Sequence, residues 1–189
     1  MNDISRRTLF ALLAGTGVGV GIGAASPAFA HGPTRQKVKE TIDIARTPAQ
    51  VWAIVGDFDS ISRWHPVIAS SPADHGNAVG SKRTLTLKAP GSPHFDETLV
   101  KYDAAGRNYQ YEIEKVDPKI LPVNNYTSWF EVRANDAGGS TVEWRGAFYR
   151  GYMLNDPPPD LNDEASVAAV VGVYRSGLDN IKKLAEQTG

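Results

Sequence analysis

The chain of 189 residues contains no cysteine. Disulfide bonds, thiol catalysis, iron–sulfur clusters and zinc sites with cysteine ligands are therefore excluded. A bias of charge is also absent, because 20 lysines and arginines are balanced by 21 aspartates and glutamates without a run of one sign. This balance gives no indication of binding to nucleic acid or to an acidic membrane surface. Without disulfide bonds, the stability of the folded protein must come from its hydrophobic core.

The N-terminal segment has the pattern of an export signal. Arg6 and Arg7 precede a weakly apolar run from Leu9 to Ala25 that contains five glycines, and Ala28-Phe29-Ala30 follows it. A pair of arginines before a soft apolar run is typical of the twin-arginine pathway, which exports folded proteins, and Ala-x-Ala is a signal-peptidase site. We expect cleavage after Ala30 and a periplasmic protein without a stable membrane span. An uncleaved anchor is the alternative, because a span needs roughly 20 apolar residues.

Removal of the signal peptide, residues 1–30, leaves the length of one ordinary domain. We expect residues 31–36 to form a flexible lead-in and residues 37–189 to form a single α+β domain. The histidines show no spacing typical of metal ligands, so we expect neither a metal nor another cofactor; they are His31, His65, His75 and His94.

The domain begins with the pattern of one strand and two short helices. Apolar residues from Val38 to Ile44 lie at even spacing among polar ones, as in a half-buried strand. Thr47-Pro48 predicts a helix start, with threonine as the cap and proline in the first turn, and Gly56 ends that helix. A second short helix is predicted over residues 61–64.

A long stretch of alternating apolar and polar residues follows. Asp103–Gly106 and Asn135–Gly139 are turn sequences within it, because their glycines accept positive φ angles. Successive strands joined by tight turns predict an antiparallel sheet with one buried face. The alternating segments are residues 84–88, 95–99, 109–114, 126–133 and 142–148.

The C-terminal part has the pattern of one long amphipathic helix. Pro157-Pro158-Pro159 forms a stiff spacer before it, and Asp160 or Asn162 can cap its start. Apolar residues then recur at steps of three and four over about 25 residues. The apolar stripe consists of Val167, Val170, Val171, Tyr174, Leu178, Ile181 and Ala185.

This order of elements resembles the helix-grip fold of the SRPBCC superfamily, which includes START, Bet v 1 and polyketide cyclase/dehydrase-like proteins. The resemblance implies a curved antiparallel sheet of about seven strands wrapped around a long C-terminal helix, with two short helices after the first strand. Its motifs are Ile44-x-x-Thr47-Pro48-x-x-Val51-Trp52, Trp64-His65-Pro66, Asp103 after a strand, and Val142-x-Trp144-x-Gly146-x-Phe148.

A narrower resemblance is to the MxaD-like family of bacterial methanol oxidation. It implies a periplasmic, non-enzymatic accessory protein whose partners are methanol dehydrogenase and its cytochrome c. The same fold also supports a polyketide cyclase-like enzyme or a carrier of hydrophobic ligands or lipids, and fold alone does not choose between them. The segments that carry this resemblance are His31–Lys37, Trp64–Ile68, Leu121–Tyr126, Gly146–Met153 and Asn155–Asp163.

Aromatic residues recur on one face of the predicted sheet, opposite Tyr174. We expect them either to border a pocket for a small hydrophobic ligand or to fill a collapsed core. The candidate pocket residues are Trp64, His65, Leu85, Leu87, Glu97, Leu99, Tyr109, Tyr111, Tyr126, Phe130, Trp144, Phe148, Val171 and Tyr174.

Two of these side chains could carry acid–base chemistry. His65 titrates near neutral pH, but no nucleophile or orienting carboxylate accompanies it at a spacing that requires a dyad, so we expect a structural or ligand-contact role and assign no catalytic residue. Glu97 lies on the apolar face of its strand and would be paired with an arginine such as Arg83, bind a ligand, or lie exposed near a strand edge. Glu143 and Arg145 are expected to face solvent.

The segment before the last helix combines a rigid triple proline with residues common in interfaces. We expect Arg150, Tyr152 and Met153 to form a docking surface for a protein partner, because stiff segments lose little entropy on binding. The alternative is that the prolines only steer the chain into the helix.

Overall fold

The structure is a computed structural model that describes residues 32–187. The predicted export signal, with Arg6, Arg7, Ala28 and Ala30, lies outside these residues. In chain order the elements are β1 (Gln36–Ile44), α1 (Pro48–Val55), the 3-10 helix η1 (Phe58–Ser60), α2 (Ile61–Trp64), β2 (Ile68–Ser70), β3 (Lys82–Leu87), β4 (His94–Asp103), β5 (Asn108–Ile113), β6 (Val123–Ala134), β7 (Ser140–Arg150) and α3 (Asp163–Gln187).

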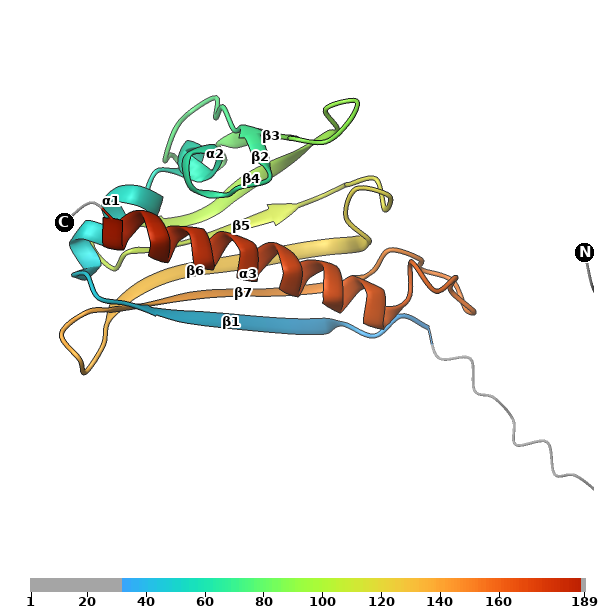
Figure 1. The fold of residues 1–189 in the computed structure, drawn as a ribbon. Coiled ribbons are helices and arrows are strands. Elements are labelled where there is room, and N and C mark those ends of the chain that lie inside the picture. Colours follow the sequence, from blue (N-terminus) through green and yellow to red (C-terminus); the bar gives the residue numbers. More distant parts are fainter. Residues whose placement is uncertain (1–31, 188–189) are drawn as a thin grey trace, which may run out of the picture.

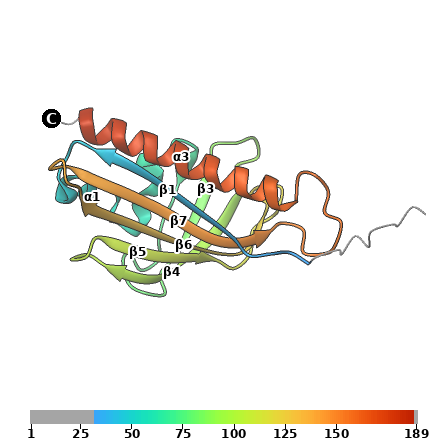
Figure 2. The same cartoon turned by 90° about the horizontal axis from the view of Figure 1, so that it is seen from below.

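The strands form one antiparallel sheet in the order β1-β7-β6-β5-β4-β3-β2. The sheet curves, and α3 lies across its concave face (Figure 1). The view from below shows α3 on one side of the sheet (Figure 2). This arrangement confirms the predicted helix-grip fold. The three-residue strand β2 had no separate prediction, because so short a segment shows no alternation.

The start of α1 is set by local hydrogen bonds. Thr47 Oγ1 accepts the backbone N–H of Gln50, and the Gln50 side-chain oxygen accepts the backbone N–H of Thr47. This capping box, together with Pro48 in the first turn, fixes the point at which β1 gives way to helix. Gly56 follows the last residue of the helix, as predicted.

The start of α3 resolves a choice that the sequence leaves open. Asn162 Oδ1 accepts the backbone N–H of Ala165 at 2.8 Å, so Asn162 caps the helix and Asp160 does not. Most of the predicted stripe is buried, but Ser166 and Gly177 also face the sheet. A methyl group at Gly177 would lie only 2.8 Å from ring atoms of His65 and Trp144, so glycine permits the close approach of α3 to the sheet.

The expectation that Glu143 faces solvent is wrong, because its side chain is buried although it lies on the same face of β7 as the exposed Arg145. Lys39 lies 2.8 Å from its carboxylate, and Arg133 and Arg145 lie 3.2 and 3.7 Å away. Partial burial raises the pKa of Glu143, but hydrogen bonds from Lys39 and Arg133 outweigh this effect and hold the pKa below its ordinary value. Long cationic side chains from adjacent strands thus cover the carboxylate, while Arg145 itself stays exposed.

Candidate functional site: a cavity with a buried ion pair

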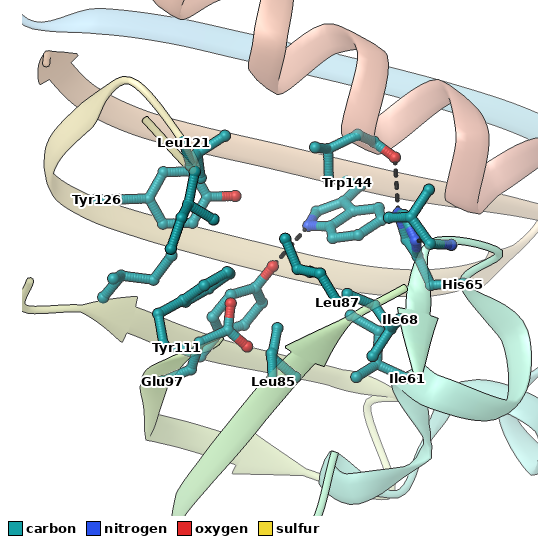
Figure 3. A pocket seen from close by; sticks show the side chains of 15 residues that line it. Ile61, His65, Ile68, Leu85, Leu87, Glu97, Tyr111, Leu121, Tyr126 and Trp144 are labelled. Atoms are coloured by element: carbon teal, nitrogen blue, oxygen red, sulfur yellow. Dashed lines mark hydrogen bonds between the residues drawn. The ribbon is translucent and has the colours of Figure 1, made fainter. Parts of the chain in front are cut away.

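A cavity of about 190 Å³ lies between the sheet, α2 and α3 (Figure 3). Strands β3, β4 and β5 each contribute two of its lining residues, and residues 120–121 close one side. The wall is almost entirely aliphatic and aromatic, which is typical of small-molecule sites. The lining residues are Ile61, His65, Val67, Ile68, Leu85, Leu87, Phe95, Glu97, Tyr111, Ile113, Ile120, Leu121, Tyr126, Trp144 and Val173.

The structure brings half of the candidate pocket residues to this cavity. Those that line it are His65, Leu85, Leu87, Glu97, Tyr111, Tyr126 and Trp144. The alternation of apolar residues along each strand therefore identified the inner face of the sheet.

The other candidates lie outside the cavity lining. They are Trp64, Leu99, Tyr109, Phe130, Phe148, Val171 and Tyr174.

The aromatic rings among them fill space by packing on one another. Phe130 stacks on Tyr109 with ring centroids 5.3 Å apart, and Tyr174 stacks on Trp144 at 4.4 Å. Trp64 packs on Phe130 at 5.7 Å. The aromatic residues therefore match both expectations: some of them fill the core, and others border a cavity.

A buried ion pair between β3 and β4 adjoins the cavity, and Glu97 is the member of the pair that lines it. Arg83 is 1% exposed and Glu97 is 3% exposed, and Arg83 Nε donates to Glu97 Oε2 at 2.6 Å. Arg83 Nη2 lies 2.5 Å from the same oxygen without the alignment of a hydrogen bond. Arg83 Nη1 donates to the backbone carbonyl of Phe58. The guanidinium also lies over the rings of Phe58 and Tyr111, at 4.1 and 4.9 Å from their centroids.

The ion pair with Arg83 is one of the three roles that the sequence predicted for Glu97. The burial of Glu97 excludes the role of an exposed residue near a strand edge. Burial raises the pKa of Glu97 above its ordinary value, while the charge of Arg83 opposes that rise. For Arg83, burial disfavours the charged form, but attraction to Glu97 outweighs it and raises the pKa. A carboxyl group with a raised pKa beside a cavity is a candidate functional group.

The hydroxyl groups between α3 and the sheet form a chain of hydrogen bonds whose direction can be assigned. Ser128 Oγ donates to the backbone carbonyl of Arg145, which can only accept. Tyr174 therefore donates to Ser128 at 3.1 Å, and Tyr126 donates to Tyr174 at 2.5 Å. Burial raises the pKa of both tyrosines, so they stay protonated. The chain ties α3 to β6.

Trp144 connects this chain to the cavity. Its indole Nε1 donates to Ser128 Oγ at 2.9 Å. It also donates to the Tyr111 hydroxyl at 3.0 Å, a bond that Figure 3 shows. Ser128 was not among the sequence candidates. Its even spacing from Tyr126 and Phe130 places it on the inner face, and a buried serine there indicates a hydrogen-bond partner.

His65 is held by backbone groups on both ring nitrogens. Nε2 lies 3.0 Å from the Val173 carbonyl and must donate to it, and Nδ1 then accepts the backbone N–H of Val67 at 3.4 Å. Burial lowers the pKa of His65 and the hydrogen bond to Val173 only partly opposes this. The ring is therefore neutral and joins α2 to α3, as expected of a structural histidine.

The predicted docking residues differ in accessibility. Arg150 is buried: its Nε and Nη2 donate to the carbonyls of Tyr152 and Leu154, and its Nη1 lies 3.6 Å from Asp163. It shapes the loop from inside and is not presented to a partner. Tyr152 is half-buried, and Met153 is 42% exposed.

Residues 32–187 lack two further features. No group of three or more histidine, aspartate or glutamate side chains in this part of the chain is placed to hold a metal ion. No helix in it is long and apolar enough to cross a membrane.

The fold and the cavity define the class of protein. The model of the family described as polyketide cyclase / dehydrase and lipid transport matches residues 35–186. The chain therefore belongs to this family. A comparison with curated proteins found no match.

Solved structures show the same fold. An uncharacterised protein from Bacillus thuringiensis is 27% identical with a TM-score of 0.64, covering 79% of this chain and 98% of its own. The protein XoxI from Bacillus cereus is also 27% identical with a TM-score of 0.64, covering 78% and 94%. Norcoclaurine synthase from Thalictrum flavum, in complex with dopamine and hydroxybenzaldehyde, is 13% identical with a TM-score of 0.60, covering 96% and 99%. At 13% identity the last similarity concerns the fold alone.

Proposed function

We propose that this protein is a periplasmic, non-enzymatic member of the family that binds a small apolar ligand and assists methanol oxidation. The observation that carries the ligand-binding role is the apolar cavity of about 190 Å³ on the inner face of the sheet. An engineered apolar cavity of about 150 Å³ binds benzene, so this space suits a compact molecule and is too small for a lipid.

The hydrogen bonding around the cavity supports a role in binding more than in catalysis. His65 uses both ring nitrogens to join α2 and α3. Tyr126 and Trp144 donate to neighbouring side chains. Groups held in this way contribute to rigidity, whereas a general acid or base needs a free position toward its substrate.

The accessory role in methanol oxidation rests on the narrower resemblance to MxaD-like proteins. The segments that carry it include Gly146–Met153, which ends at the loop before α3. Within this loop Met153 is exposed, and the buried Arg150 holds the backbone at Tyr152 and Leu154. We propose that Tyr152 and Met153 contact methanol dehydrogenase or its cytochrome c, because a pre-ordered apolar loop loses little entropy on docking.

The accessory role is tested in a periplasmic extract from a strain that lacks this protein. Addition of the purified protein is expected to increase methanol-dependent reduction of cytochrome c. The Tyr152→Ala/Met153→Ala variant is expected to lose this effect, and Val79→Ala, at another exposed apolar residue, is the matched control. Equal activity of the extract with and without the wild-type protein would exclude the accessory role.

The periplasmic location rests on the paired arginines and the cleavage motif. Substitution of Arg6 and Arg7 by lysine is expected to retain the full-length protein in the cytoplasm, as shown by cell fractionation. N-terminal sequencing of the periplasmic form is expected to begin at His31. Export of the double-lysine variant at the wild-type level would exclude the twin-arginine route.

A polyketide cyclase-like enzyme is the second candidate, and Glu97 is the observation in its favour. Its carboxyl group has a raised pKa and lines the cavity, so it could transfer a proton to or from a bound substrate. In that case Glu97→Gln would abolish turnover of a substrate while the variant still bound it. A binding protein would instead return the ligand chemically unchanged, which native mass spectrometry and analysis of the released ligand would show.

A further inference from the structure

The proposed ligand-binding role leaves open which class of molecule enters the cavity, and the polar atoms of its wall bear on this question. Resting on that role, we infer that the cavity selects a compact, uncharged molecule of about one aromatic ring that carries a hydrogen-bond donor, and that this donor binds Glu97 Oε1.

The size limit follows from the volume. About 190 Å³ is slightly larger than the engineered cavity of about 150 Å³ that holds benzene and smaller than the 300–1,000 Å³ of drug-sized sites. The aliphatic lining from Leu85, Leu87 and Ile113 offers no hydrogen bonds to a more polar ligand. A single ring with one small polar substituent matches both the space and the wall.

The position of the donor follows from the geometry of the ion pair. Both short contacts of Arg83 reach Oε2 of Glu97. Oε1 makes no hydrogen bond to any of the described residues, and it is not among their fully buried atoms without a partner, so it is open to the cavity that Glu97 lines. Figure 3 shows the carboxyl group beside the ring of Tyr111 on the cavity wall. A ligand that fills the cavity without an N–H or O–H would cut this oxygen off from water and leave it without a donor, which is costly, whereas a ligand with such a group would satisfy it.

The requirement for an uncharged ligand follows from the same pair. Arg83 already neutralises Glu97, so a cationic ligand would enter an apolar cavity without a free counter-charge. An anionic ligand would lie against the carboxylate. Either charge would lose its hydration without an equivalent gain.

Binding to the wild-type protein is measured with ring compounds of similar size. Phenol carries a donor, toluene has the same shape without one, and benzylammonium and benzoate carry charges. Trp144 lines the cavity, so its fluorescence and the NMR signals of the lining residues report binding. We expect phenol to bind at least as tightly as toluene, although water solvates phenol better, and we expect no binding of the two ions.

The Glu97→Gln variant provides an inversion test. Arg83 can only donate, so it retains the amide oxygen and the amide NH₂ turns toward the cavity. A donor then replaces the acceptor, and the ratio of the affinities for phenol and benzonitrile, which only accepts, should fall roughly ten- to a hundred-fold. Circular dichroism confirms that the variant folds. If it does not, the ranking of phenol, toluene and the ions on the wild-type protein decides alone.

The outcomes separate this inference from the proposed function. If none of the neutral rings binds, the cavity is not a ligand site and the proposed ligand-binding function fails. If toluene binds more tightly than phenol, or if either ion binds, the ligand role stands and the assignment of Glu97 Oε1 is wrong. An unchanged phenol to benzonitrile ratio in a folded Glu97→Gln protein would also overturn it.

Discussion

The two halves of the sheet are covered differently. On the side of β1, β7 and β6, the helix α3 lies directly on the strands, and Tyr174 reaches Tyr126 and Ser128 (Figure 1). On the side of β5, β4 and β3, α2 and the segment around residues 120–121 form the cover. The cavity lies under this cover and reaches the first region only at Tyr126, Trp144 and Val173. We call these regions the helix-packed half and the cavity half.

The difference shows how this fold combines stability with a binding site. A straight helix of 25 residues cannot follow a curved sheet across its full width. The helix therefore fills one half with side chains such as Tyr174, Leu178 and Ile181, which are fully buried. In the cavity half, shorter elements cover the sheet in place of α3, and the inner face carries the ion pair. Close packing there is incomplete.

The largest expected effect concerns the ion pair of the cavity half. Arg83→Met leaves Glu97 buried without a counter-charge and is expected to lower the free energy of unfolding by about 3–5 kcal/mol. The Arg83→Met/Glu97→Leu protein has no buried charge at this site and should recover most of the loss. Urea unfolding at pH 7, followed by circular dichroism, measures both. A loss below about 1 kcal/mol in the single variant would show that Glu97 does not depend on Arg83.

This pair also shows what the sequence can and cannot predict. Alternation along the strand at 95–99 places Glu97 on the inner face, and the alternation at 83–87 places Arg83 there too. Their pairing depends on the register of β3 against β4, in which Arg83 lies opposite Glu97. Register across a strand pair is not visible in either segment alone.

The boundary between filled core and cavity could not be predicted. Tyr109 and Tyr111 have the same spacing pattern and both are buried, yet only Tyr111 lines the cavity. What distinguishes them is the packing of elements distant in sequence, because Tyr109 stacks on Phe130 and Tyr111 receives a hydrogen bond from Trp144. By contrast, the helix starts at Thr47 and Asn162 follow from local hydrogen bonds and were among the predictions.

The next effect concerns the contact between α3 and the sheet. Gly177→Ala places a methyl group against the rings of His65, Trp144 and Trp64, at 2.8 to 3.1 Å, and is expected to lower stability by about 1–3 kcal/mol. Gly172→Ala is the matched control in the same helix. Apart from its chain neighbours and the backbone of its own helix, no atom lies within 4 Å of the added methyl, so we expect a gain of about 0.5–1 kcal/mol from helix propensity. Equal effects in urea unfolding would contradict close packing at Gly177.

The same substitution, isoleucine to phenylalanine, made once in each half compares how tightly the two halves are packed. Ile181→Phe adds volume where α3 leaves no space and is expected to cost about 1–3 kcal/mol. Ile113→Phe adds the same volume beside the cavity and should cost less, about 1 kcal/mol or below, because the ring can enter the cavity. Toluene binding should be lost in the Ile113→Phe protein only. If both substitutions destabilise the protein equally, the cavity half is packed as tightly as the other.

The smallest effect concerns His65, which lies where the two halves meet. Burial lowers its pKa, so the unfolded chain binds a proton that the folded protein does not. The stability that His65 contributes is therefore present above its unfolded pKa of 6.5 and is lost as the pH falls toward its folded pKa, by at most about 1.4 kcal/mol per pH unit.

The His65→Gln variant isolates this contribution. Glutamine can still donate to the Val173 carbonyl but does not titrate, so the variant should lose less stability than the wild type between pH 6.5 and about 5. Glu97 acts with the opposite sign, because its raised pKa favours the folded state as the pH falls, but it is common to both proteins. The difference between their urea unfolding curves thus reports His65. Parallel pH profiles of the two proteins would contradict this role of His65. They would mean that Nδ1 gives up the hydrogen bond from Val67 N–H and accepts a proton in the folded protein, and that the junction between α2 and α3 tolerates the charge.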